Sequence, residues 1–248
     1  MRNEELVSPT AGMCDGFTQA NLVILPKKDA LDFAIYAQRN PKPLPLLDIA
    51  EPGDYEPKLM APNADLRTDL PKYRVYKKGN VTDEPLNIKK YWQDDFVAFL
   101  IGCSFTFERA LIDAGIPIRH REEGKNVPLY NTNKDTIPGG TFKGPMVVSM
   151  RPIHYKKVVK AVQVTSRFPS VHGAPIHIGD PPRIGITDLD DPDFGDAVTI
   201  REGEIPVFWG CGVTAQLAAM KAKPEMMITH YPGHMFITSR KDKEYSVL

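Results

Sequence analysis

The chain has 248 residues, of which 42% are hydrophobic and 25% are charged, proportions that are ordinary for a soluble globular protein. Lys plus Arg and Asp plus Glu both number 31, so the net charge is zero and the basic excess of a nucleic-acid-binding protein is absent. No apolar run approaches the length of a membrane span, and none follows the N-terminus as in a signal peptide, so we expect a cytoplasmic protein that contacts no membrane.

The first predicted element is a helix over residues 29–39, which Asp29 is placed to cap. A proline-rich but ordered connection over residues 41–85 follows, and within it residues 73–76 are typical of a strand. The helix is expected to use one face for packing, formed by Leu31, Ala34, Ile35 and Gln38.

A strand, a tight turn and a helix are predicted over residues 96–115, where Gly115 is placed to stop the helix. The pattern then changes over residues 116–187, where short extended pieces and one helix indicate an antiparallel α+β arrangement. The extended pieces are expected at residues 118–122, 127–131, 146–150 and 175–178, and the helix at about residues 154–167.

After Asp188 the alternation of strand and helix returns and ends in a strand at residues 226–229. The predicted fold class is therefore α/β, with a three-layer α/β domain interrupted by a smaller α+β domain. Residues 1–115 and 188–248 are assigned to the α/β domain, and residues 116–187 to the inserted domain.

One short pattern occurs twice and is the most informative feature of the chain. An apolar run at residues 96–100 precedes Gly102-Cys103-Ser104-Phe105-Thr106, and a second at residues 205–209 precedes Gly210-Cys211-Gly212-Val213-Thr214. Each predicts a buried strand that turns sharply into a helix, whose free backbone N–H groups suit an anion. We predict that these two Gly-Cys corners converge on a small molecule bearing more than one carboxylate.

Each polar residue of the corners admits a chemical and a structural interpretation. Cys103 and Cys211 lie at a helix start, where a thiol pKa can be lowered, but a small inert residue also fits a tight turn. Thr106 and Thr214 are placed either to donate to a substrate or to cap a helix. The candidate substrate-binding residues of the corners are Ser104, Thr106, Glu108, Gly212, Thr214 and Gln216.

Further candidates lie outside the corners. His230 and His234 flank Tyr231-Pro232-Gly233, so we expect a loop that presents a histidine as acid or base rather than a helical metal pair. Asp193 and Asp196 bracket an aromatic–glycine turn and are catalytic candidates. Arg151 follows an apolar strand, where it is placed either to clamp a carboxylate or to form a salt bridge between domains.

Nine blocks along nearly the whole chain match one known family, namely residues 19–26, 38–43, 68–76, 102–108, 144–152, 173–181, 192–196, 206–214 and 228–238. They resemble the D-glutamate cyclase family, many of whose bacterial members are called hydro-lyases. Three residues depart from the family pattern: Gly210, Ala215 and Ser239 stand where alanine, proline and aspartate are usual.

The resemblance implies a two-domain α/β fold and an activity that converts D-glutamate to 5-oxo-D-proline and water, which is named for longer relatives with a further domain. The leading hypothesis is a cofactor-independent hydro-lyase, a carbon–oxygen lyase, acting on a small amino or carboxylic acid. Two alternatives stay open: a two-thiol amino-acid racemase using Cys103 and Cys211, and a non-catalytic dicarboxylate-binding module. No metal, nucleotide or nucleic-acid partner is expected, and the sequence leaves open whether the chain forms a homo-oligomer.

Overall fold

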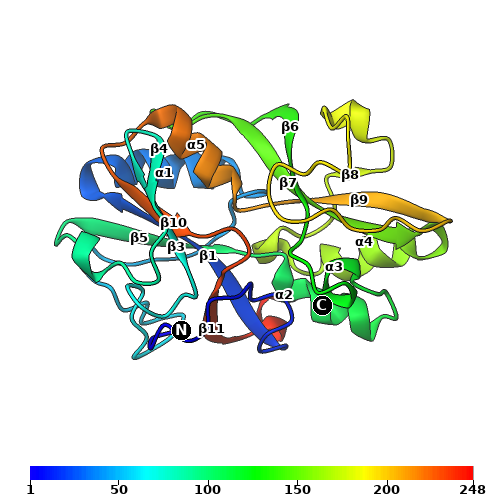
Figure 1. Cartoon of the computed structure of the whole chain (residues 1–248), viewed down its shortest axis with the longest axis horizontal. Coiled ribbons are helices and arrows are strands. Elements are labelled where there is room, and N and C mark those ends of the chain that lie inside the picture. The colour runs from blue at the N-terminus through cyan, green and yellow to red at the C-terminus, as the bar shows by residue number, and fades with distance from the viewer. Residues whose placement is uncertain (248) are drawn as a thin grey trace.

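The computed structural model describes residues 1–247, which form two antiparallel sheets lying side by side (Figure 1). The larger sheet has seven strands in the order β2-β5-β1-β10-β3-β4, and β11 also pairs with β1. Its strands are β1 (Phe17–Pro26), β2 (Leu46–Ile49), β3 (Tyr73–Lys77), β4 (Asn80–Asp83), β5 (Phe96–Gly102), β10 (Met227–His230) and β11 (Phe236–Lys241).

The smaller sheet has four strands in the order β6-β7-β9-β8: β6 (Leu129–Asp135), β7 (Pro145–His154), β9 (Glu204–Gly210) and β8 (His177–Ile178). None of the helices within residues 1–247 is long and apolar enough to cross a membrane. The helices are α1 (Lys27–Arg39), α2 (Phe105–Asp113), α3 (Arg119–Glu122), α4 (Val158–Ser166) and α5 (Thr214–Ala222), and short 3-10 turns precede α4 and follow β11.

The mixed α/β fold class is confirmed, and most predicted elements are present near their expected positions. The four-stranded sheet takes β9 from beyond the predicted insertion of residues 116–187, and the domain boundaries stay a prediction. The extended piece predicted at residues 118–122 is wrong, because α3 occupies it. The helical turn brings Arg119 to Glu204 and His120 to Glu108, pairings that apolar spacing does not encode.

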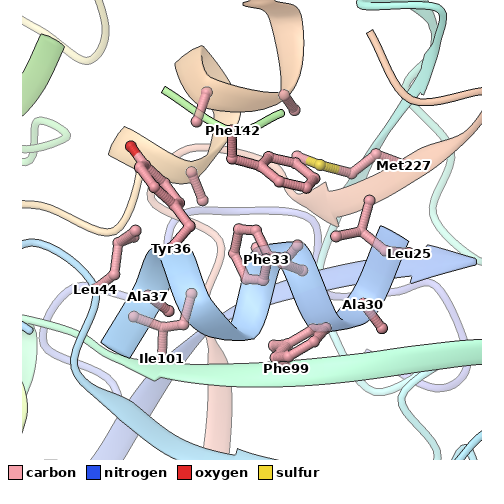
Figure 2. Packing of buried hydrophobic residues seen from close by; sticks show 14 of the residues in the cluster. Leu25, Ala30, Phe33, Tyr36, Ala37, Leu44, Phe99, Ile101, Phe142 and Met227 are labelled. Atoms are coloured by element: carbon pink, nitrogen blue, oxygen red, sulfur yellow. The ribbon is translucent and has the colours of Figure 1, made fainter. Parts of the chain in front are cut away.

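The predicted packing face of α1 is also wrong: Leu31 is 70% exposed, whereas Ala30, Phe33, Tyr36 and Ala37 are buried. Figure 2 shows Phe33 beside Phe99 of β5 and Phe142, with ring centroids 4.8 and 5.3 Å away. The aromatic face of α1 is the one that packs inward, because burying one such side chain stabilises the fold by about 1.5–3 kcal/mol. Phe142 comes from the turn between β6 and β7, so this core joins both sheets.

The two Gly-Cys corners exchange helices between the sheets. Helix α2 follows β5 of the larger sheet, yet its Phe107 packs with Trp209 of the smaller sheet. Helix α5 follows β9 of the smaller sheet, yet its Ala215 and Ala218 pack in the core of α1 and the larger sheet. Figure 1 shows α5 beside α1, and α2 near α3 and α4. Each corner therefore carries the chain from one sheet to the layer covering the other.

The threonines of the corners fasten each helix start to the sheet it leaves. Thr106 Oγ1 accepts the Gln19 N–H of β1 at 3.1 Å. Thr214 Oγ1 accepts the Val147 N–H of β7 at 2.9 Å and donates to the Cys211 carbonyl at 2.7 Å. Neither hydroxyl caps its own helix, so both belong to the structural joint between strand and helix.

Two residues further along, each helix is anchored to the sheet it enters. Glu108 of α2 pairs with Arg151 of β7. Gln216 of α5 accepts a hydrogen bond from the Tyr76 hydroxyl of β3 at 2.9 Å and donates to the His230 carbonyl at 3.2 Å. The match between Glu108 and Gln216 in the sequence thus corresponds to equivalent roles in the fold.

Because both threonine hydroxyls satisfy a buried backbone N–H, Thr106→Val and Thr214→Val should each destabilise the fold by about 1–3 kcal/mol. Urea unfolding followed by circular dichroism measures the loss. Thr199→Val is the matched control, because Thr199 is exposed and its replacement should change stability by less than about 0.5 kcal/mol. If the two buried variants are as stable as the control, the threonine hydroxyls do not hold the helix starts to the sheets.

Candidate active site

The two Gly-Cys corners meet at Asn21 of β1. Asn21 Nδ2 donates to the Gly102 carbonyl at 2.8 Å, and a Cβ on Gly212 would lie 2.3 Å from Asn21 Cγ. Cys103 and Cys211 also share one apolar cluster with Phe105, Val213 and Met235. The predicted convergence of the corners is therefore present, but an amide and apolar side chains pack where they meet.

Both corner thiols have raised pKa values, which goes against the first of the two interpretations of Cys103 and Cys211 that the sequence leaves open. Burial raises the pKa of Cys103 above its usual range, and burial raises that of Cys211 to about 11. The apolar cluster disfavours a thiolate more strongly than the helix start favours it. At neutral pH both side chains are protonated thiols, and the geometry favours the interpretation as packing residues.

Arg151 binds a carboxylate of the chain itself. Its Nε and Nη2 donate to Glu108 Oε1 at 3.0 and 2.5 Å, and its other bonds go to the hydroxyls of Ser149 and Ser104 at 3.0 Å. Of the two interpretations of Arg151, the geometry supports the salt bridge between halves of the molecule. Ser104 and Glu108 accordingly lie in this buried network rather than on a ligand-binding surface.

The charge of Glu108 is stabilised despite complete burial. Burial by itself raises its pKa, but the proximity of His120 and Arg151 outweighs that effect and lowers the pKa to about 2. His120 Nε2 lies 3.2 Å from Glu108 Oε1, and its ring stacks on Phe105. His120 was not among the sequence candidates, since its position depends on helix α3.

The two candidate histidines lie in different surroundings. His230 ends strand β10 rather than lying in a loop, and its Nδ1 faces the Leu22 backbone N–H at 3.2 Å. Burial lowers the pKa of His230 to about 4, which makes it neutral at physiological pH. His234 lies in the following turn. No group of three or more His, Cys, Asp or Glu side chains within residues 1–247 is arranged to hold a metal.

Three of the candidate catalytic residues, Asp193, Asp196 and His234, line one cavity of about 390 Å³. Its apolar lining includes Phe194, which also packs against the cluster that holds the two cysteines. The cavity therefore lies next to the point where the corners meet. Its polar lining consists of Arg74, Asn126, Asp193, Asp196, Tyr231 and His234.

The acidic loop of the cavity is held against the beginning of β6. Phe194 exchanges two backbone hydrogen bonds with Leu129, at 2.9 and 3.3 Å. Both Asp193 oxygens accept from Asn131, whereas Asp196 accepts the Asn126 N–H through Oδ2 at 2.8 Å. Asp193 is therefore largely committed to the loop, and Asp196 is the carboxylate better placed to meet a ligand.

The cavity lining also has a cationic and aromatic part, formed by Arg74 and Tyr231. Arg74 of β3 pairs with Glu84 at 2.8 Å, and its guanidinium lies 4.6 Å from the centre of the Tyr231 ring. Lys72 contributes a second cation 4.0 Å from the same ring. Sequence reasoning missed Arg74, although a lone arginine between the apolar Tyr73 and Val75 is a signal that could have drawn attention to it.

His234 is held by backbone carbonyls. Its Nδ1 lies 3.0 Å from the Pro232 carbonyl, and its Nε2 lies 3.2 Å from the Val7 carbonyl of the N-terminal segment. Burial lowers the pKa of His234. The neighbouring Gly233 has a φ of +82°, and a Cβ there would lie 2.4 Å from Asn126 Oδ1, so only glycine permits this turn.

The lining of the cavity combines a cation, two carboxylates and an aromatic ring, which complements a molecule carrying both signs of charge. The Arg74 wall attracts a carboxylate, the Asp196 loop attracts an ammonium, and Phe194 offers apolar contact between them. A carboxylate next to a bound ammonium can also accept its proton. Outside the cavity, Thr106, Thr214, Gln216 and His230 make the buried contacts described above, and any catalytic or binding role of the candidate residues stays a prediction.

A family model described as D-glutamate cyclase matches residues 97–239. A protein of Geobacillus kaustophilus is 63% identical over 248 residues, covering 100% of this chain and 94% of that protein. A Bacillus subtilis protein is 59% identical over 248 residues, covering 100% and 96%. A Thermoanaerobacter sp. protein is 65% identical over 243 residues, covering 98% and 92%. Each of these relatives is named "Putative hydro-lyase".

Among solved structures, a nitrogen repressor-like protein of Methanococcus jannaschii superposes with a TM-score of 0.41 at 10% identity, covering 96% of this chain and 94% of that one. A similarity of this size supports no argument about fold or function.

The pKa of Glu108 generates a prediction about acid stability. Because its folded pKa of about 2 lies below the ordinary 4.5, its stabilisation is present above pH 4.5 and is lost as the pH falls through 2. At about 1.36 kcal/mol per unit, the loss amounts to about 3 kcal/mol. Urea unfolding at several pH values should show this decline in the native protein.

The variant Glu108→Gln should remove that decline and destabilise the protein at neutral pH by about 3–5 kcal/mol, because Arg151 loses its buried counter-charge. Glu202→Gln changes an exposed carboxylate and serves as control. If Glu108→Gln is as stable as the control at neutral pH, the ion pair between Glu108 and Arg151 does not hold α2 to the smaller sheet.

The thiol environments predict selective modification. At about pH 8, iodoacetamide should alkylate the exposed Cys14 quickly and leave Cys103 and Cys211 unmodified, because thiolates are the reacting species. Mass spectrometry should find one alkyl group on the folded native protein and none on folded Cys14→Ser. The native protein should carry three alkyl groups after unfolding. Rapid alkylation of either corner cysteine in the folded protein would contradict the raised pKa values.

Proposed function

The chain belongs to the D-glutamate cyclase family, and we propose that it is a carbon–oxygen lyase that removes water from a small amino acid bearing two carboxylates. The observation that carries this proposal is one cavity whose lining combines Arg74 with Asp193 and Asp196. D-Glutamate fits that distribution of charge, since it carries one ammonium and two carboxylates. The hydro-lyase names of the relatives support the same class of reaction.

In the proposed complex, Asp196 receives the ammonium and Arg74 receives the carboxylate that is attacked. Lys72 lies over the Tyr231 ring and pairs with Glu84 at 3.0 Å, so it shares with Arg74 the one carboxylate that both contact. Phe194 and the Pro232 turn contact the methylene groups. His234 is assigned a positioning role, because backbone carbonyls surround both of its ring nitrogens.

The proposed cyclisation forms one C–N bond and breaks one C–O bond. Asp196 accepts a proton from the ammonium, and the free amine attacks the side-chain carboxyl carbon. Arg74 stabilises the negative charge that develops on the carboxyl oxygens. Asp196 then returns its proton to the departing oxygen, and a second proton from the nitrogen follows, so one water leaves and the lactam keeps one N–H.

The two thiols are given no proton-transfer role in this proposal. An opposed-thiol racemase needs one thiolate, and a pKa of about 11 for Cys211 leaves only about one thiol in ten thousand ionised at neutral pH. The racemase therefore serves as an outcome of the test and not as a second proposal.

We expect purified protein incubated with D-glutamate to give 5-oxo-D-proline, detected by mass spectrometry as the loss of one water. Asp196→Asn should lower kcat by about 10²–10⁴-fold, because the amide cannot accept the proton. Asp191→Asn is the matched control, since Asp191 lies in the same acidic segment but does not line this cavity.

The same incubation in deuterium oxide separates the alternatives. Cyclisation leaves the α-hydrogen in place, whereas a racemase introduces solvent deuterium at the α-carbon. A thermal shift with D-glutamate but no product would instead indicate a binding module. Absence of turnover with D-glutamate and with a panel of amino and hydroxy dicarboxylic acids would overturn the proposed function.

A further inference from the structure

A second, larger cavity of about 690 Å³ shares no lining residue with the candidate active site. It lies between α2, α4 and the segment after β11. Its size falls within the range of small-molecule sites in proteins. Nothing in the proposed reaction uses it.

The floor of this cavity is apolar and its rim is mostly cationic. Ala110, Ala114, Val164 and Phe168 form the apolar floor. Four cations line the cavity, namely Arg109, Arg167, Lys241 and Lys243, against two acids. One acid, Asp113, is already paired with Arg109 at 2.9 Å.

The remaining cations are not all equally free. Lys241 Nζ lies 3.3 Å from the centre of the Phe17 ring, which orients that side chain. Arg167 and Lys243 are exposed and make no ion pair within residues 1–247, so they are available to a ligand. An apolar floor beneath unpaired cations complements a molecule with an apolar body and one negative end.

From this arrangement we infer that the cavity is a binding site for a small amphipathic carboxylate, separate from the candidate active site. The carboxylate meets Arg167 and Lys243, and the hydrocarbon part covers Phe168 and the two alanines of α2. Release of water from the apolar floor supplies the rest of the binding free energy.

The site is linked to the corner of α2. Thr106 lines the cavity and holds the start of α2 to Gln19 of β1. A ligand that contacts Thr106 and Ala110 therefore touches the helix that carries Glu108. Because a ligand stabilises the state that binds it, occupancy should stabilise the folded protein with α2 held in this position.

Asp242 makes the site sensitive to pH. Its N–H is held by the Gly16 carbonyl at 3.1 Å, and its Oδ1 accepts from the Thr18 hydroxyl at 3.4 Å. Burial, with the nearby Asp15, raises the pKa of Asp242 to about 6, while Lys241 opposes that rise. Below pH 6 Asp242 becomes neutral, repulsion of an anion falls, and a carboxylate binds more tightly among Arg109, Arg167 and Lys243.

Octanoate is the probe, and isothermal titration calorimetry of the full chain is the measurement, with 1-octanol as the uncharged analogue. We expect octanoate to bind saturably and 1-octanol to bind with lower affinity. Arg167→Ala should weaken octanoate binding by about tenfold, the value of one charge-assisted hydrogen bond. Lys160→Ala on the same helix α4 is the matched control, because Lys160 is exposed and lies outside the cavity.

Two further variants separate this site from the active site. Ala110→Phe should abolish octanoate binding by filling the cavity, and Asp196→Asn should leave it unchanged. Asp242→Asn should remove the tightening of octanoate binding at low pH. The inference is overturned if octanoate does not bind, if Arg167→Ala binds like Lys160→Ala, or if Asp196→Asn rather than Arg167→Ala weakens binding. Failure of D-glutamate turnover leaves each of these readouts intact.

Discussion

The buried ion pair between Glu108 and Arg151 is the interaction on which the rest of the architecture depends. It holds helix α2 on a sheet to which the preceding strand β5 does not belong. Two hydroxyls complete the hydrogen bonds of the guanidinium, and these bonds offset part of the cost of burying a charged pair. At the equivalent place Gln216 anchors α5 with neutral hydrogen bonds.

The exchange of helices explains why the cysteine corners are densely packed. Two chain crossings meet at Asn21, and each needs a glycine because the neighbouring segment approaches within the space of a Cβ. Apolar side chains from both halves fill the remaining volume, which removes water from the thiols. The same cluster supports Phe194 and so fixes the floor of the candidate active site.

The two cavities differ in chemistry because different segments supply their walls. In the candidate active site, Arg74 of β3 and an acidic loop line one cavity, so the cavity suits a ligand carrying both signs of charge. Between α2 and α4, apolar helix faces meet unpaired cations, so that cavity suits a single negative charge and a hydrocarbon. The N-terminal segment contacts His234 of the first cavity, and the 3-10 turn at Asp242–Tyr245, after β11, borders the second.

The sequence by itself determined the fold class, most strands and helices, the duplicated corners and the family, because periodicity, glycine and motif spacing act locally. It also identified Asp193, Asp196 and His234, which share a cavity. Only the tertiary structure decided the buried face of α1, the pKa values of the corner thiols and the partner of Arg151. Those properties depend on side chains brought together from distant segments, and the free energy of burial and of charge pairing is set by such neighbours rather than by adjacent residues.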